Sequence, residues 1–402
     1  MKVAVIGAGL GGLAAACALQ QAGIDVSVYE QCSELREAGA GVQITPNATR
    51  VLASIGLADE LAKFACNART GDTRRWEDFS VISSTDLGDS VRQFGQPWYA
   101  AHRADLQTML ANVLPDGVVQ LDHRLTDLSE TDGGVQLSFD GAPEATADVV
   151  IGADGIHSRV RTILFGPARA RFTGLVAYRG LLPATADAIA DMKITPGSTI
   201  VMGPGQHFVY YPVSAGRNVN WVAIEPRNDW TVESWTEPAT KAEALNAYQG
   251  WATQIQTLIA TAGLDGRQIY RWALHDRDPL PSWGHGRISL LGDAAHPMLP
   301  FLAQGAAQAF EDAAVLTRSL LRIGMVKTGN SVNIALRTYE NLRRERTAKI
   351  QLAARHNSTA FHLPDGPQQQ ARDVAMSTAK PGNPHPNSWI YEYDADQATA
   401  HL

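Results

Sequence analysis

The chain has 402 residues, of which 45% are hydrophobic and 19% charged, so it can bury a large core in two domains or in one interwoven unit. Its formal net charge of −7 gives no general attraction for phosphate backbones or anionic lipid, so we expect neither nucleic acid nor a membrane as a partner. The three cysteines form no CxxC pair and no apolar run reaches about 20 residues, which favours a cytoplasmic protein without a bound metal. We expect it to be a monomer or a homodimer.

The first thirty residues have the pattern of a dinucleotide-binding βαβ unit. KVAVI at residues 2–6 predicts a buried parallel strand, and GAGLGG followed by LAAACALQQAG predicts a tight turn leading into a helix. Gly7 permits the turn, Gly9 lets the backbone approach a pyrophosphate, and Gly12 allows the helix to pack closely on the strand. A second strand, IDVSVYE, ends in Glu30, near the spacing at which a carboxylate accepts from ribose hydroxyls. The pattern predicts a dinucleotide site but does not separate FAD from NAD.

Three later segments could complete this site. Arg103 enters a helix, where it suits either a bidentate phosphate contact or a surface ion pair with Asp105. The buried strand ADVVIGAD ends in Asp154 and a glycine turn. The strand ISLLGD ends in Asp293, and the long helix that starts near Gly305 would present bare amides that stabilise negative charge on a ring carbonyl.

Two stretches between the nucleotide segments, 75–100 and 172–270, differ in character. The second alternates apolar and polar residues in short runs bounded by glycine and proline, which predicts an antiparallel sheet. Strand alternation in QHFVYYP puts His207 on the same side as Tyr211 and puts Tyr210 on the other. The sequence does not decide which side faces a pocket.

These motifs together resemble one family. GAGLGG, Glu30, HRADL at 102–106, GADGIHSRVR at 152–161 and GDAAHPMLPFLAQGAAQAFEDA at 292–313 occur in the order found in the single-component FAD-dependent aromatic hydroxylases. Salicylate hydroxylase, 3-hydroxybenzoate 6-hydroxylase and 6-hydroxynicotinate 3-monooxygenase are similar in pattern. The resemblance extends from residue 1 to WIYEYDAD near the C-terminus.

The resemblance implies an α/β fold like that of para-hydroxybenzoate hydroxylase. A three-layer, Rossmann-like FAD-binding domain would be interwoven with an antiparallel-sheet substrate domain and followed by C-terminal helices. The expected segments are 1–74, 101–171 and 271–360 for the FAD-binding domain, 75–100 and 172–270 for the substrate domain, and 361–402 for a tail packed on the body.

The resemblance also implies the cofactors. FAD would be bound, NADH or NADPH would visit transiently because the chain has one GxGxxG motif, and O2 would be a co-substrate. The residues implied to bind FAD are Gly7, Gly9, Gly12, Glu30, Arg36, Arg103, Asp154, Asp293, Pro297, Gly305 and Ala306.

The implied reaction is the hydroxylation of a hydroxylated aromatic or N-heteroaromatic carboxylic acid through a C4a-hydroperoxyflavin, with or without decarboxylation. A base beside the ring hydroxyl would speed oxygen transfer. The candidate catalytic residues are His207, Tyr210 and Gln304, and the candidate substrate-binding residues are Gln43, Arg179, Tyr211 and Phe301.

Several of these assignments have alternatives. Gln304 could bind a substrate hydroxyl or cap a helix, and Arg179 could anchor a carboxylate or form an ion pair between segments. Gln43 and Phe301 stand where 6-hydroxynicotinate enzymes carry histidine, which argues against that substrate. The other functional classes open to the chain are an FAD oxidase or dehydrogenase of amines and a flavin-binding redox sensor without turnover.

Overall fold

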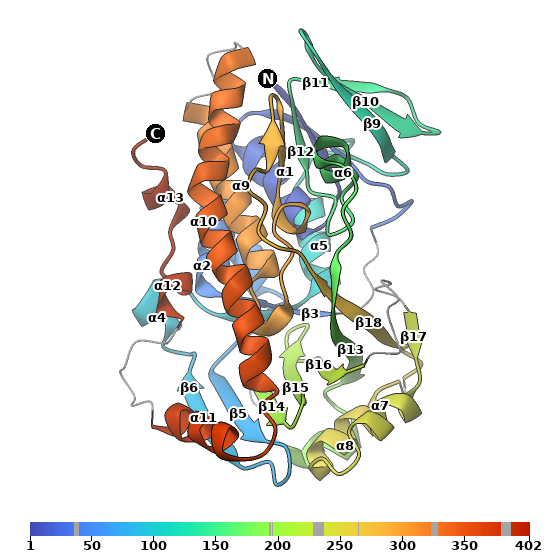
Figure 1. Cartoon of the computed structure of the whole chain (residues 1–402), viewed down its shortest axis with the longest axis vertical. Helices are drawn as coiled ribbons and strands as arrows, with labels where there is room; N and C mark the ends of the chain where they lie inside the picture. The colour runs from blue at the N-terminus through green and yellow to red at the C-terminus, as the bar shows by residue number, and fades with distance from the viewer. Residues whose placement is uncertain are drawn as a thin grey trace.

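The computed structural model describes residues 1–35, 40–192, 194, 196–227, 237–263, 265–322, 329–378 and 387–402. Two large sheets lie one after the other along the long axis, and helix α10 (Gly329–Phe361) runs beside both (Figure 1). At 1.5 Å per residue, a helix of 33 residues is about 50 Å long. None of the described helices is both long enough and apolar enough to cross a membrane.

The first sheet has six strands in the order β19-β20-β12-β1-β2-β8. Strand β1 pairs in parallel with β2 and with β12, as the predicted βαβ unit requires. Strand β1 has a paired strand on each side and is buried on both faces, which explains why KVAVI is almost continuously apolar. The strands are β1 (Lys2–Ile6), β2 (Asp25–Tyr29), β8 (Val119–Gln120), β12 (Val149–Gly152), β19 (Gly284–His285) and β20 (Ile288–Leu290).

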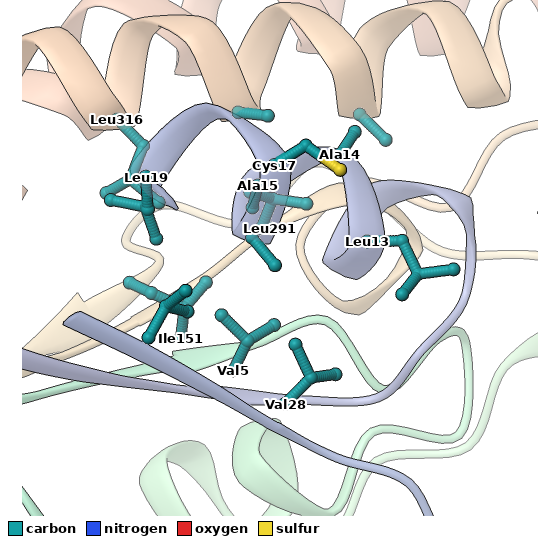
Figure 2. Packing of buried hydrophobic residues seen from close by; sticks show 14 of the residues in the cluster. Val5, Leu13, Ala14, Ala15, Cys17, Leu19, Val28, Ile151, Leu291 and Leu316 are labelled. Carbon is teal, nitrogen blue, oxygen red and sulfur yellow. The ribbon is translucent and has the colours of Figure 1, made fainter. Parts of the chain in front are cut away.

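Helix α1 (Leu10–Gln21) lies between this sheet and helix α9 (Gly305–Arg322), as Figure 2 shows. Val5, Val28 and Ile151 point up from the sheet toward Leu13 and Leu19 of the helix. Alanines on α1 leave room for α9 to approach closely on the other side. The remaining helices of this half are α2 (Pro46–Ser54), α3 (Ala58–Ala62), α5 (Arg103–Asn112) and α6 (Arg159–Phe165).

The second sheet has eight strands in the order β17-β18-β13-β16-β15-β14-β5-β6. All neighbours are antiparallel except β14 and β5, so the predicted antiparallel pattern is confirmed for the central strands. Strands β5 and β18 each lie wholly in this sheet, although the expected segment boundaries at 74/75 and 270/271 divide them. The strands are β5 (Thr70–Arg75), β6 (Val81–Asp86), β13 (Arg171–Pro183), β14 (Gly197–Gly203), β15 (Gln206–Val213), β16 (Asn218–Pro226), β17 (Glu237–Ala239) and β18 (Ile269–Asp276).

The two faces of the eight-stranded sheet have different neighbours. Helices α7 (Lys241–Ala247) and α8 (Thr253–Thr261) cover one face, over a core that contains Phe208, Tyr210 and Trp221. The other face looks toward the six-stranded sheet (Figure 1). Short 3-10 turns, η1 (Asp187–Met192), η2 (Gly292–Ala294) and η3 (Pro300–Leu302), complete the loops.

Two three-stranded sheets and four short helices complete the fold. One small sheet has the order β3-β7-β4, the other β11-β10-β9, and α11 packs against β6. These elements are β3 (Gly41–Ile44), β4 (Cys66–Asn67), β7 (Tyr99–His102), β9 (Arg124–Thr131), β10 (Gly134–Asp140), β11 (Ala145–Ala147), α4 (Ser90–Phe94), α11 (Pro367–Ser377), α12 (Ser388–Tyr391) and α13 (Ala395–Ala398).

Candidate active site

A cavity of about 370 Å³ opens between the carboxyl ends of the first sheet and the inner face of the second. One part of its lining comes from the loops of the six-stranded sheet: Gly9, Leu10, Gly11, Arg103, Ala153, Gly155, Asp293, Pro297, Gly305 and Ala306. The other part comes from the eight-stranded sheet: Arg179, His207, Val209, Tyr211, Val222, Ile224, Trp272 and Leu274. The size and mixed lining are typical of a site for a small molecule beside a cofactor.

The glycine-rich turn at the start of α1 serves two purposes. Gly7 has φ +104°, and a Cβ there would lie 2.6 Å from the Ala153 carbonyl oxygen. A Cβ on Gly12 would lie 2.0 Å from the Gly7 carbonyl oxygen, so both glycines are needed by the fold itself. A Cβ on Gly9 would meet no atom within 4 Å, and no side chain caps α1. The open space at Gly9 and the bare helix start fit a bound pyrophosphate.

Glu30 ties the end of β2 to this turn. Its Oε2 accepts a hydrogen bond of 2.7 Å from the Ala8 amide, and its Oε1 accepts one of 3.0 Å from the Cys32 amide. Because each carboxylate oxygen has a second lone pair, Glu30 can also accept from two ribose hydroxyls.

Asp154 provides a buried acceptor that the fold leaves partly unused. Its Oδ2 accepts from the amides of Arg159 at 2.7 Å and Val160 at 3.1 Å, which holds the start of α6. Its Oδ1 is buried and accepts no hydrogen bond in the described part of the chain. Burial raises the pKa of this carboxyl group. A hydroxyl group of a bound ligand would satisfy the second oxygen.

Asp293 faces into the cavity from the turn after β20. Its side chain makes no hydrogen bond to any described residue, and burial raises its pKa although Arg103 and Arg161 oppose that shift. Arg161 donates a hydrogen bond of 2.8 Å to the Ala294 carbonyl, which fixes the turn. A carboxylate held in this position suits the hydroxyl groups of a ribityl chain. Arg36 lies outside the described residues, so its predicted contact stays a prediction.

Strand β15 presents His207, Val209 and Tyr211 to the cavity. Phe208 and Tyr210 point to the opposite face, into the core beneath α7 and α8. Tyr210 therefore lies on the wrong side of the sheet for the catalytic role suggested above, because strand alternation separates it from the cavity. The Tyr211 hydroxyl makes no hydrogen bond to a described residue, and burial raises its pKa.

Gln304 lies at the cavity edge, but protein groups occupy its side chain. Nε2 donates to Thr45 Oγ1 at 2.9 Å, and Oε1 accepts from Asn47 at 3.1 Å and from Gln308 at 3.0 Å. The side chain is fully buried. The described hydrogen bonds of this side chain include no helix cap, and its predicted contact with a substrate hydroxyl stays a prediction, because Gln304 lines the cavity. It holds the start of α9 against α2.

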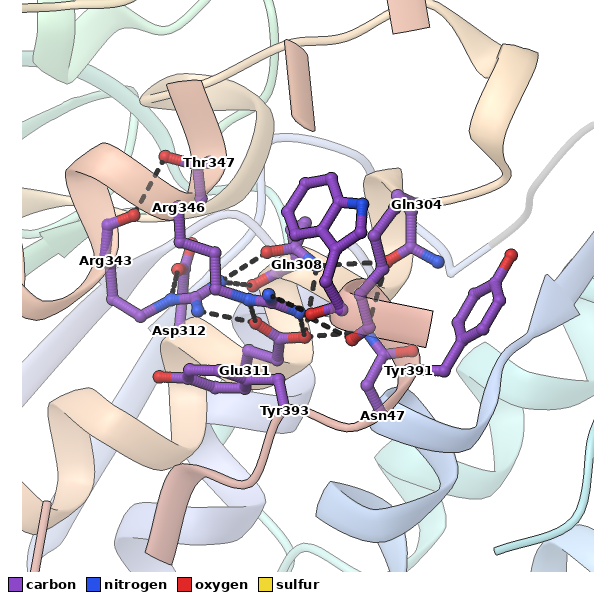
Figure 3. A network of polar contacts seen from close by, with 12 residues as sticks. Asn47, Gln304, Gln308, Glu311, Asp312, Arg343, Arg346, Thr347, Tyr391 and Tyr393 are labelled. Carbon is purple, nitrogen blue, oxygen red and sulfur yellow. Dashed lines mark hydrogen bonds and ion pairs between the residues drawn. The ribbon is translucent and has the colours of Figure 1, made fainter. Parts of the chain in front are cut away.

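Gln304 is the end of a larger buried network (Figure 3). Asn47 donates to Glu311 at 2.6 Å, and Glu311 binds Arg343 at 2.5 Å and Arg346 at 2.8 Å. Burial alone would raise the pKa of Glu311, but the two guanidinium groups overcome this effect and lower it. The network fixes α9, and with it the cavity wall at Gly305.

The remaining predicted substrate residues differ in position. Gln43 lines the cavity, with its amide bound to Ser198 at 3.1 Å and to Trp98 at 3.3 Å. Arg179 is 3% exposed and lines the cavity, and its guanidinium lies 5.0 Å from the Trp272 ring centroid. Phe301 does not line the cavity, because it packs behind the wall, 5.4 Å from the His207 ring. Its predicted substrate contact is therefore not supported.

Sequence reasoning missed His362, which follows the end of α10. Its Nε2 lies 2.7 Å from Nδ1 of His207. Burial lowers the pKa of His362 to about 4, and burial together with His362 lowers the pKa of His207 well below its ordinary value. The two histidines are 155 residues apart in sequence, so no local motif could have paired them.

Comparison with known proteins agrees with this geometry. The family model described as FAD binding domain matches residues 1–354. The chain is 41% identical to a 3-amino-4-hydroxybenzoate 2-monooxygenase of Streptomyces platensis, covering 98% of this chain and 96% of that protein. It is 37% identical to a 6-hydroxynicotinate 3-monooxygenase of Bordetella bronchiseptica, covering 91% of this chain and 93% of that one.

Solved structures give the same result. HpxO of Klebsiella pneumoniae, complexed with FAD and uric acid, is similar with a TM-score of 0.85 and 30% identity, covering 99% of this chain and 96% of that one. The predicted family, fold class and cofactor are confirmed. The chain belongs to the FAD-dependent aromatic-ring monooxygenases, with FAD as its bound cofactor and NAD(P)H and O2 as the co-substrates of the family.

Proposed function

We propose that the chain hydroxylates an aromatic ring that carries both a hydroxyl group and a carboxylate, and that it favours a hydroxybenzoate over 6-hydroxynicotinate. The observation that carries the proposal is the grouping of Arg179, His207 and Tyr211, all from the eight-stranded sheet, in the lining of the cavity that Asp293 also lines. Support comes from the similarity to 3-amino-4-hydroxybenzoate 2-monooxygenases over nearly the whole chain.

The strand register sets the spacing of these groups. Arg179 pairs with Val222, and Val222 pairs with Val209, two residues from both His207 and Tyr211. Two strand spacings and two residues along a strand separate the Cα atoms of Arg179 and His207 by roughly 12 Å. With both side chains directed into the cavity, one substituted aromatic ring can reach from the guanidinium to the imidazole.

Each polar group then has one role. The buried guanidinium of Arg179 binds the carboxylate, because its planar donors match that group. His207 accepts the proton of the ring hydroxyl, which makes the ring more electron-rich and a better nucleophile. The Tyr211 hydroxyl donates a hydrogen bond to the same ring oxygen and holds the ring in place.

The rest of the wall excludes water. Val209, Val222, Ile224 and Leu274 give the substrate side an apolar surface. Bound FAD supplies the electrons from NADH or NADPH and the activation of O2, and a dry cavity keeps that chemistry directed at the substrate. Helix α9 begins at Gly305 on the cavity wall, so the positive end of its dipole stabilises negative charge there.

Two further properties belong to the proposal. The net charge of −7 supports a small molecule rather than nucleic acid or anionic lipid as the partner, and we propose a cytoplasmic monomer or homodimer. Both hydroxylation alone and hydroxylation with loss of the carboxylate fit the same cavity.

The test uses purified protein loaded with FAD. NADH and NADPH oxidation, O2 uptake and product mass are measured with 3-amino-4-hydroxybenzoate, salicylate and 6-hydroxynicotinate. We expect at least one hydroxybenzoate to stimulate oxidation and to gain one oxygen atom, and a loss of carbon dioxide in the product mass would identify the decarboxylating reaction. Absence of stimulation by every acid would contradict the proposal and favour an amine oxidase or a redox sensor, whereas oxidation without O2 uptake would indicate a reductase.

A further inference from the structure

The imidazole of His207 joins the cavity to a second imidazole outside it. His207 is buried on β15 and lines the cavity, whereas His362 follows the end of α10 and is partly exposed. Nδ1 of His207 and Nε2 of His362 lie 2.7 Å apart. Because Nδ1 is engaged in this hydrogen bond, Nε2 of His207 is the ring nitrogen that remains for a ligand. The two rings form a hydrogen-bonded path from the cavity toward the surface.

We propose that His362 is a positioning residue for the hydroxylation: it fixes the tautomer of His207 and passes the proton that His207 takes from the ring hydroxyl on to solvent. This inference rests on the proposed function. It adds the route by which the proton of the ring hydroxyl leaves the site, and it assigns a role to His362, which does not line the cavity.

The proton transfers balance without a further reactant. The O–H bond of the substrate breaks, its electrons stay on the ring oxygen, and a bond forms from the proton to Nε2 of His207. The proton on Nδ1 of His207 moves to Nε2 of His362, and the proton on Nδ1 of His362 leaves to water. Reprotonation of the product hydroxyl along the same path in reverse restores both tautomers.

The surroundings of the pair oppose a resting positive charge. Phe301 and Phe361 pack on His207 with ring centroids 5.4 Å and 5.3 Å away. Strand β14 places Met202 opposite His207. No carboxylate of the described residues forms an ion pair with either imidazole, so none of these carboxylates stabilises an imidazolium there.

The charged side chains that follow His362 in the chain form ion pairs with one another and with Arg75. Arg75 contacts Asp373 at 2.9 Å and Asp365 at 3.5 Å, and Arg372 contacts Asp373 at 2.7 Å. The lowered pKa values of both histidines agree with this arrangement. A proton accepted by His207 alone would remain as a buried charge, whereas the second ring lets it continue to water.

The test measures proton release. FAD-loaded protein is mixed, in a weakly buffered solution with a pH indicator, with the hydroxybenzoate that supports turnover. We expect His362→Phe to slow proton release and oxygen transfer by at least about tenfold and to make both rates depend on buffer concentration. Added imidazole should restore the rate of His362→Ala, because the small side chain leaves the place of the ring open, and His207→Phe should abolish the fast release.

The control is His356→Phe, which changes an exposed histidine on α10, the helix that precedes His362, and should leave every rate unchanged. His362→Gln keeps a polar side chain but carries no proton between two ring nitrogens, so it should be as slow as the phenylalanine variant. Wild-type rates in both variants at position 362 would overturn this inference alone. If no acid stimulates NADH oxidation in the wild type, the proposed function fails, and this inference fails with it.

Discussion

Arg343 of α10 donates a hydrogen bond of 2.7 Å to Asp312 of α9, and neither side chain is exposed to solvent. The same guanidinium binds Glu311 at 2.5 Å. Two carboxylates and one arginine therefore lie in the protein interior, and each of the three depends on the others for its charge to be stable. His296 adds a contact of 2.6 Å to Asp312.

Replacement of Arg343 should be strongly destabilising. Arg343→Met keeps the apolar part of the side chain but removes the donor to Asp312 Oδ1 and one of the two guanidinium groups at Glu311, so we expect a loss of about 3–5 kcal/mol in the free energy of unfolding. Urea unfolding followed by circular dichroism measures this loss. Lys63→Met, which removes a surface partner of Glu60, is the matched control and should change stability by less than about 1 kcal/mol. Equal effects of the two substitutions would contradict the prediction.

The same network should make part of the stability sensitive to acid. The pKa values of Glu311 and Asp312 are lowered in the folded protein, since their cationic partners outweigh burial. Groups of this kind stabilise the fold above their unfolded pKa values, about 4, and lose that contribution as the pH falls through the folded values. The stability difference between the wild type and Glu311→Gln should therefore be largest near pH 6 and shrink below pH ~4. A difference that grows toward low pH would contradict this assignment.

Two glycines of the first turn should respond differently to the same substitution. Gly12→Ala places a Cβ 2.0 Å from a carbonyl oxygen and should cost at least about 1–3 kcal/mol of stability. Gly9→Ala meets no protein atom within 4 Å, so the apoprotein should keep its stability, while FAD affinity falls by about tenfold or more. Thermal unfolding of apoprotein and a flavin fluorescence titration separate the two effects. Normal FAD affinity in Gly9→Ala would show that the pyrophosphate lies elsewhere.

Asp293 should be needed for FAD rather than for folding. Asp293→Ala removes a carboxylate that no described donor satisfies, so FAD should bind about 10- to 100-fold more weakly, the range expected for a hydrogen bond to a charged group. The apoprotein should be no less stable, because the Asp293 side chain is exposed to the cavity and makes no hydrogen bond to a described residue that the fold would lose. Asp59→Ala on the exposed surface of α3 is the control. Undiminished FAD content in Asp293→Ala would contradict the placement of the cofactor.

Substitution of the neighbouring tyrosines Tyr210 and Tyr211 on β15 should distinguish an effect on substrate binding from an effect on core packing. Tyr211→Phe removes a hydroxyl that faces the cavity, and KM for the hydroxybenzoate should rise by about 2- to 10-fold. Tyr210→Phe changes only the core beneath α7 and α8, so it should leave KM and kcat within about twofold and lower stability by at most about 1 kcal/mol. Steady-state kinetics with the same acid measures both. The reverse result would mean that the other face of the strand meets the substrate.

How far the sequence predicted this site depends on the range of the interactions involved. Gly7, Gly9 and Gly12 act within one turn, so their spacing was enough to predict their role. The alternation of side chains along β15 correctly grouped His207 with Tyr211. Which face of the strand meets the cavity depends on how the two sheets pack, and the alternation pattern carries no information on that packing.

The errors have the same physical origin. For Gln304 the sequence leaves a substrate contact and a helix cap open, and neither alternative includes its contact with Thr45, which is 259 residues away in the chain. Phe301 lies one layer behind the wall that His207 forms. His362 stands in a segment with weak local patterning, and only the folded chain brings it to β15.

The anchoring of the last described segment has a consequence for biosynthesis. Arg346 donates to the carbonyls of Trp389 at 3.1 Å and Ile390 at 2.7 Å, and Arg50 donates to that of Tyr393 at 2.5 Å. Arg346 neutralises the carboxylate of Glu311, so the Arg346 side chain is fully fixed only after residues 389–393 have been translated. The nucleotide-binding turn is translated well before these residues, so the nascent chain cannot complete the interior beside that turn until residues 389–393 have also been made.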